Sequence, residues 1–134
     1  MWKCPKCQRE FYKYKQSHSC VSYPIENHFK NKPESKVLFD ELVGKIEKEI
    51  GEVKIESLQC CIHLVSNYTF SGVWILKDRI RLDFRVNYPI QSERIVKEEK
   101  LSINRNLYYL EIKDKKDIDK EILKWIEDSY HLKK

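Results

Sequence analysis

Four side chains that bind soft metals are concentrated in the first 22 residues of this 134-residue chain. Cys4 and Cys7 are separated by two residues, and His18 and Cys20 follow after ten more. Cysteines at this spacing form a tight knuckle, and the ten-residue excursion is long enough to bring His18 and Cys20 back to it. A unit of this size cannot bury a core, so a bound metal must supply its folding free energy. The spacing therefore predicts one structural zinc ion per chain.

Other interpretations of these cysteines stay open. A Cys-x-x-Cys pair also occurs in redox proteins, but there it belongs to a thioredoxin-like βαβ context, which this sequence lacks. Simple reduced cysteines are a third possibility. His28 is an alternative fourth ligand, unless it packs where the first segment meets the rest of the chain. Because four protein ligands leave no position for water, the predicted site is structural and not catalytic.

The composition fits one globular body, with 41% hydrophobic and 12% aromatic residues. No apolar run approaches the ~18 residues of a membrane helix. The first six residues have no apolar stretch of the kind that a secretory signal carries. We therefore expect a cytoplasmic protein with no membrane partner, whose five cysteines are thiols or metal ligands and not disulfides.

Hydrophobic periodicity predicts an α+β body. After a zinc-binding unit (1–22) and a polar connector (23–34), residues 35–134 begin with a helix that Ser35 caps and Gly51 ends. The apolar period then changes to two, most clearly over 79–86, where every second residue is apolar. A final helix follows, capped by Asp117 or Asp119. The predicted fold is thus a helix, about five antiparallel strands and a C-terminal helix, with helices on one face of the sheet.

Two segments of the body receive a specific interpretation. Cys60 and Cys61 are adjacent in an expected strand, so their side chains should point to opposite faces and bind no common ion. The charged segment 93–100 is predicted to be a surface connection between strands. Cys61 and His63 share a face and suggest a nucleophile and a base, but no third, orienting group can be identified.

The excess positive charge lies in the first 36 residues, which carry eight Lys or Arg and three Glu, whereas the remainder is neutral. Basic residues attract polyanions, although a modest positive charge also serves solubility alone. Interleaved aromatic residues could stack on unpaired bases or pack the zinc unit against the body. The basic candidates for ligand binding in this arm are Lys6, Arg9, Lys13 and Lys15.

A second basic feature is the alternation of Arg79, Arg81 and Arg85 along one strand face. Such a stripe binds phosphates or carboxylates in forked geometry, or else it forms cross-strand ion pairs on a solvated face. The chain contains no glycine-rich phosphate loop and no hydrolase or metalloprotease motif. No catalytic residue is predicted.

Short motifs across the chain resemble a family of bacterial and archaeal domains of unknown function, number 5655, sometimes labelled a predicted transport protein. The resemblance lies in Leu38–Leu42, in Ile80–Val86 and in Asp117–Tyr130, and in some members also in Trp2–Cys7, Gln16–Cys20 and Glu26–Phe29. It implies the same four zinc ligands and a compact α+β body. It also implies a nucleic-acid context, because related domains are attached to nucleic-acid-processing proteins. Similar proteins carry histidines where this chain has Tyr108 and Tyr109.

Taken together, these features favour a non-enzymatic, zinc-containing binding module whose basic arm contacts nucleic acid. One alternative is a domain that binds a small molecule or another protein on its sheet face, in a pocket lined by Trp74 and Tyr108, with the zinc unit as a lid. Another is an enzyme that uses Cys61, His63 or the arginines, which a cysteine of strongly lowered pKa in a cleft would indicate.

Overall fold

The computed structural model describes residues 2–5, 10–15 and 23–132. The chain begins with an antiparallel hairpin, in which Trp2 lies opposite Phe11. Two helices, a six-stranded antiparallel sheet, a short 3-10 turn and a last helix follow. Their bounds are β1 (Trp2–Lys3), β2 (Glu10–Phe11), α1 (Glu26–Phe29), α2 (Pro33–Glu49), β3 (Lys54–Ser57), β4 (Ile62–Val65), β5 (Thr69–Ile75), β6 (Ile80–Val86), β7 (Ile95–Ser102), β8 (Arg105–Ile112), η1 (Lys115–Asp117) and α3 (Lys120–Tyr130).

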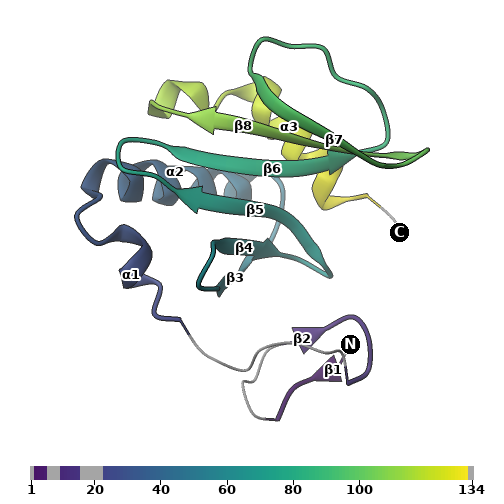
Figure 1. Ribbon diagram of the computed structural model, residues 1–134, viewed down its shortest axis with the longest axis horizontal. Helices are drawn as coiled ribbons and strands as arrows, with labels where there is room; N and C mark the ends of the chain where they lie inside the picture. Colours follow the sequence, from purple (N-terminus) through teal and green to yellow (C-terminus); the bar gives the residue numbers. More distant parts are fainter. Residues whose placement is uncertain (1, 6–9, 16–22, 133–134) are drawn as a thin grey trace.

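The large sheet has the strand order β3-β4-β5-β6-β8-β7, and α2 and α3 cover the same face of it (Figure 1). The predicted α+β class, antiparallel sheet and C-terminal helix are confirmed. The sheet has six strands where about five were predicted. The interpretation of the charged segment 93–100 as a surface connection is wrong, because this segment contributes most of β7, which pairs with β8 at the sheet edge. Among the described residues, no helix combines the length and the apolar content that a membrane crossing requires.

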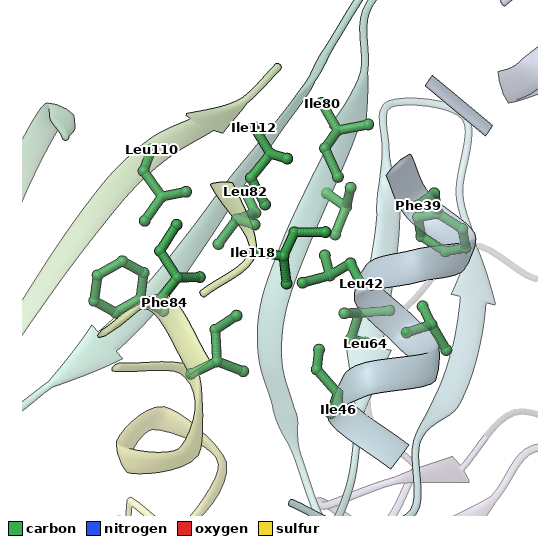
Figure 2. Packing of buried hydrophobic residues seen from close by; sticks show 14 of the residues in the cluster. Phe39, Leu42, Ile46, Leu64, Ile80, Leu82, Phe84, Leu110, Ile112 and Ile118 are labelled. Carbon is green, nitrogen blue, oxygen red and sulfur yellow. The ribbon is translucent and has the colours of Figure 1, made fainter. Parts of the chain in front are cut away.

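The core lies between this sheet and the two helices (Figure 2). Alternate residues of β6 point into it, and Ile80, Leu82 and Phe84 are completely buried. Leu42 and Ile46 of α2 point toward these residues from the helix side of the core and are equally inaccessible. Burying an aliphatic or aromatic side chain contributes roughly 1.5–3 kcal/mol, so this alternation fixes which face of the sheet is left outside.

The start of α2 differs from the prediction. The helix begins at Pro33, whose missing N–H and fixed φ suit the first turn, and Lys32 occupies the cap position without a side-chain bond. Ser35 is completely buried, and its hydroxyl reaches the carbonyls of Leu76 and Arg79 in the β5–β6 turn. Ser35 therefore ties the helix to the sheet and does not cap it.

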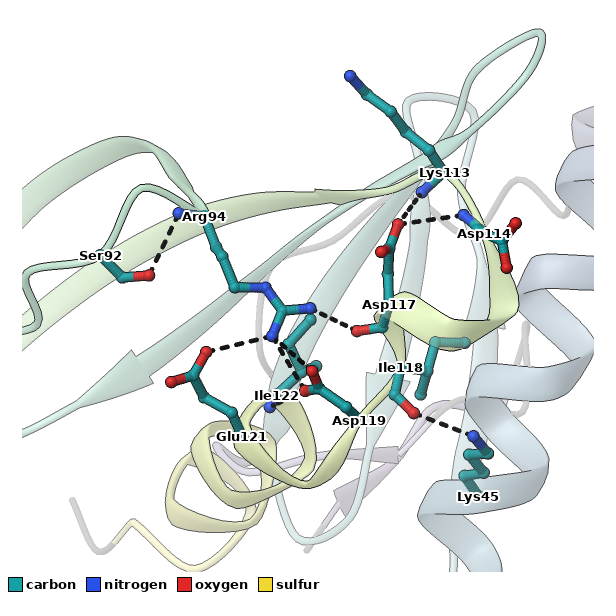
Figure 3. Close-up of polar contacts among 10 residues, drawn as sticks. All are labelled: Lys45, Ser92, Arg94, Lys113, Asp114, Asp117, Ile118, Asp119, Glu121 and Ile122. Carbon is teal, nitrogen blue, oxygen red and sulfur yellow. Dashed lines mark hydrogen bonds and ion pairs between the residues drawn. The ribbon is translucent and has the colours of Figure 1, made fainter.

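The C-terminal helix is capped as expected, since Asp119 accepts a hydrogen bond from the Ile122 N–H at 3.1 Å. Arg94, just before β7, reinforces this cap by donating to both oxygens of Asp119, to Glu121 and to the Asp117 carbonyl (Figure 3). Because Arg94 comes from the edge of the sheet, its guanidinium fixes the beginning of α3 against the end of the β6–β7 connection.

Candidate functional site

The N-terminal hairpin carries the predicted metal site, and of its four ligands only Cys4 is among the described residues. Cys4 follows β1 directly and is 4% exposed. Trp2 and Phe11 pack against each other beside it, with ring centroids 5.9 Å apart. Cys7, His18 and Cys20 lie outside the described residues, as do Lys6 and Arg9. Within the described part, no three His, Cys, Asp or Glu side chains form a metal-binding group.

The alternative ligand His28 lies in α1. Its side chain is 8% exposed, and its ring packs edge-on against Tyr23 at 4.8 Å. This contact agrees with the packing role that the sequence left open for His28. Its role as an alternative metal ligand stays a prediction, because three of the four proposed ligands lie outside the described residues.

The segment that follows β2 exposes aromatic and basic side chains together. Tyr12 is 62% and Tyr14 76% exposed, and both neighbouring lysines are exposed as well. The Lys15 ammonium lies 5.6 Å from the Tyr14 ring centroid, a cation–π arrangement. Phe11 packs on Trp2 within the hairpin, and the Tyr14 ring meets Trp2 edge-on at 6.1 Å while most of its surface stays exposed. Stacking of these aromatics on bases stays a prediction.

Two clefts lie where the hairpin meets the body, and Tyr12 lines both. The outer cleft, about 350 Å³, lies on the helix-free face of the sheet. The end cleft, about 560 Å³, lies beside the C-terminal end of α3. An ion pair of 2.9 Å between Glu10 and Lys54 joins the hairpin to β3 at this place.

Strand register assembles the floor of the outer cleft. Glu56 lies opposite His63, and His63 lies opposite Gly72. The Gly72 N–H then donates to the Asp83 carboxylate at 2.7 Å. A Cβ at Gly72 would approach that carboxylate to 3.3 Å, closer than ordinary contact. A side chain at this position would push the Asp83 carboxylate away by a few tenths of an ångström, so glycine favours this close approach.

Strands β5 and β6 separate under this floor. Their regular pairing ends at Val73 and Leu82. Beyond that point, Ser71 Oγ donates to the Asp83 carbonyl at 2.6 Å. Ser129 of α3 bridges the two strands by accepting from the Arg85 N–H at 2.9 Å and donating to the Phe70 carbonyl at 2.7 Å. Side chains thus replace the ladder bonds and hold the strands apart.

The electrostatics of the floor centre on Asp83. Burial raises the pKa of this carboxyl, while the hydrogen bond from Gly72 and the charge of Arg85 act in the opposite direction. Burial also raises the pKa of the neighbouring Tyr109, with further contributions from Glu99 and Asp83. A partly desolvated carboxyl is suited to accept hydrogen bonds from a polar ligand, because water competes less there.

The three arginines of the predicted stripe have different environments. Arg79 and Arg81 both bind Glu111 on β8, at 3.1 Å and 2.8 Å, and the hydrogen bond from Arg81 contributes most to lowering the pKa of Glu111. They form the cross-strand ion pairs that the sequence offered as one alternative. Arg85 lines the outer cleft, and no carboxylate of the described residues lies within 4.0 Å of its guanidinium.

Two expectations about the sheet face are corrected. Trp74 has Tyr109 as its neighbour, at 5.8 Å, because Tyr108 points into the core, where its hydroxyl accepts from the Ile90 N–H. The thiol of Cys61 is buried, and this burial raises its pKa to about 12. That shift is opposite to the lowered pKa of a nucleophilic cysteine, so the enzyme alternative based on Cys61 loses its support.

The sequence interpretation missed the contributions of Gly72, Ser71, Ser129 and Asp83 to the site. One local signal was present, because a glycine inside an apolar strand pattern often marks a close approach of backbone or ligand. Ser71 and Ser129 gave no such signal, because their hydrogen-bond partners lie on other elements, which a single sequence does not bring together.

The fold and site define an α+β domain with two helices on one face of an antiparallel sheet and a polar cleft on the other. Residues 25–133 match the family described as Domain of unknown function (DUF5655), and the chain belongs to this family. The N-terminal hairpin precedes the matched residues. No curated protein and no solved structure matches the chain.

Proposed function

We propose that the protein is a non-enzymatic, zinc-containing module that binds single-stranded nucleic acid with its N-terminal hairpin. The observation that carries the proposal is the exposure of Tyr12 and Tyr14 beside Lys13 and Lys15. Exposed aromatic rings stack on unpaired bases, each worth about 1–3 kcal/mol, and lysines neutralise the phosphates between them. In a duplex the bases already stack on one another, so they are not available to the tyrosine rings and binding should be weaker.

The clefts extend this surface onto the body. Tyr12 lines both the end cleft and the outer cleft. A nucleic-acid strand whose base stacks on Tyr12 therefore has one cleft on each side of that base. In the outer cleft, the Asp83 carboxylate can accept from a base amino group, and the Arg85 guanidinium can donate to a base carbonyl. The acidic groups Glu10 and Glu56 line the same cleft, which favours the entry of a neutral base over that of the phosphate backbone.

The zinc ion belongs to the proposal as the element that organises the hairpin. Cys4, a buried thiol directly after a strand, would bind it together with Cys7, His18 and Cys20. Purified protein should then contain about one zinc per chain, and removing the metal should weaken nucleic-acid binding because the hairpin loses its fold. Full zinc content in a Cys7→Ser variant would refute this ligand set.

Fluorescence anisotropy with a labelled single strand and the matching duplex tests the binding. For the wild-type protein, the logarithm of affinity should fall linearly with the logarithm of salt concentration. The double variant Lys13→Gln/Lys15→Gln should reduce that slope by about 1.4, given roughly 0.7 per single-strand phosphate contact. The variant Lys115→Gln/Lys116→Gln removes the same charge elsewhere and should leave the slope unchanged. Equal effects of the two variants, or no salt-dependent binding at all, would refute the proposal.

A second candidate function is the binding of a small polar molecule in the outer cleft, with the hairpin as its cover. The desolvated Asp83 on a glycine floor is the observation that favours it. Native mass spectrometry of the purified protein distinguishes the two functions. A small ligand that co-purifies with the wild type and disappears in Asp83→Asn would support this second function.

A further inference from the structure

The turn between β3 and β4 holds two cysteine sulfurs in contact. Sγ of Cys60 and Sγ of Cys61 are 3.2 Å apart. The expectation that the side chains point to opposite faces fails because the residues precede β4, which begins at Ile62. The Leu58 N–H donates to the Cys61 carbonyl at 2.9 Å and closes the turn. Cys60 is exposed and Cys61 is 3% exposed, so a reagent can reach the pair from one side.

A direct disulfide fits this pair poorly. Consecutive Cα atoms are about 3.8 Å apart across a trans peptide, whereas disulfides usually join Cα atoms about 4.4–6.8 Å apart. A bridging atom fits better. Two thiolates on one tetrahedral zinc ion, with Zn–S bonds of about 2.3 Å, lie roughly 3.8 Å from each other. The sulfurs therefore need to move by only a few tenths of an ångström to share one inserted atom.

The number of available ligands decides which atom that is. Zinc needs four ligands in a structural site. Within the described ranges, no third His, Cys, Asp or Glu joins the two sulfurs in a metal-binding group. The inserted atom must therefore bind thiolates well and need no more than two ligands from the protein. A soft centre that carries its own third substituent meets both conditions.

We propose that Cys60 and Cys61 form a dithiol site for trivalent organic arsenicals. A compound R–As=O reacts with both thiols to give R–As(S-Cys60)(S-Cys61) and one water molecule. Two As–S bonds form, the As=O bond breaks, and the two thiol protons leave with the oxygen. Arsenic stays trivalent, so no oxidant or reductant is required. The site is independent of nucleic-acid binding, although Leu58 of the same turn lines the outer cleft.

Phenylarsine oxide and the full-length protein test the site. Trypsin releases the peptide 55–77, which contains Cys60, Cys61 and none of the other three cysteines. After treatment of the native protein, this peptide should carry one phenylarsenic group in place of two hydrogens. Cys60→Ser and Cys61→Ser should each lower the affinity at this peptide by about a hundredfold or more, because the second bond is no longer intramolecular.

The same digestion after treatment in urea is the control for access, since an unfolded chain also presents adjacent cysteines. Modification of peptide 55–77 in urea only would overturn the proposal, because it would show that the fold hides the pair. Equal modification of the two serine variants and the wild type would also overturn it, because one thiol would then suffice. Circular dichroism of each variant confirms that it is folded.

Discussion

Ser129→Ala should destabilise the protein strongly for so small a change. Ser129 is 1% exposed, and its hydroxyl bonds two backbone groups, the Arg85 N–H and the Phe70 carbonyl. Alanine leaves both groups without a partner in a region that water does not reach. Each orphaned buried group costs about 1–3 kcal/mol, so the loss of two partners should lower the free energy of unfolding by about 2–6 kcal/mol. That is a large part of the 5–15 kcal/mol typical of a whole domain.

Equilibrium unfolding in urea, followed by tryptophan fluorescence, measures this loss. The matched control is Ser102→Ala on the exposed edge strand β7, which should change stability by less than about 0.5 kcal/mol. The full loss requires that β5 and β6 do not pair with each other once the Ser129 hydroxyl is removed. A loss below about 1 kcal/mol would refute it, because the strands would then have closed and satisfied their own backbone groups.

Three further changes test other parts of the structure. Because burial raises the pKa of Asp83, the folded state binds the proton of this carboxyl more tightly than the unfolded state does. The wild type should therefore lose stability as pH rises from the ordinary pKa of 3.8 through the raised value. Asp83→Asn should remove this loss in urea titrations from about pH 4 to 7. Gly51→Ala should cost about 1–3 kcal/mol because its Cβ would lie 2.6 Å from the Tyr130 hydroxyl oxygen, and Tyr130→Phe in the same chain should recover part of the loss in a double-mutant cycle. Trp125→Ala removes a ring stacked on Phe84 at 5.6 Å and should lower the melting temperature, with a cost of about 2–4 kcal/mol because the ring is only half-buried; no change would place the ring outside the core.

Sequence alone predicted those elements whose pattern the core enforces. β6 alternates between buried and partly exposed residues along its whole length, because helices cover one face only. β7 was missed because it lies at the sheet edge, where seven of its eight residues are exposed and no alternation is required. Ser35 was misassigned because a serine near a helix start usually caps it. Pro33, two residues earlier, was the available sign that the helix had already begun.

The candidate site depends on register, which a single sequence does not provide. Arg79, Arg81 and Arg85 are equivalent in the strand pattern. They differ only because Glu111 on β8 lies opposite Arg81 and reaches Arg79 as well. The adjacent cysteines show the same limit, since the side-chain directions of Cys60 and Cys61 depend on where the turn ends and β4 begins.

The outer cleft is not explained by the needs of the fold. The outer face of an antiparallel sheet can remain in water, so nothing in the packing requires a desolvated carboxyl there. Asp83 nevertheless takes the place of a ladder acceptor for Gly72, and two buried serines satisfy the neighbouring backbone groups. Groups that cost stability in a cleft are typical of functional sites, and Asp83 is therefore the residue of the outer cleft that most supports the proposed binding surface beside the hairpin.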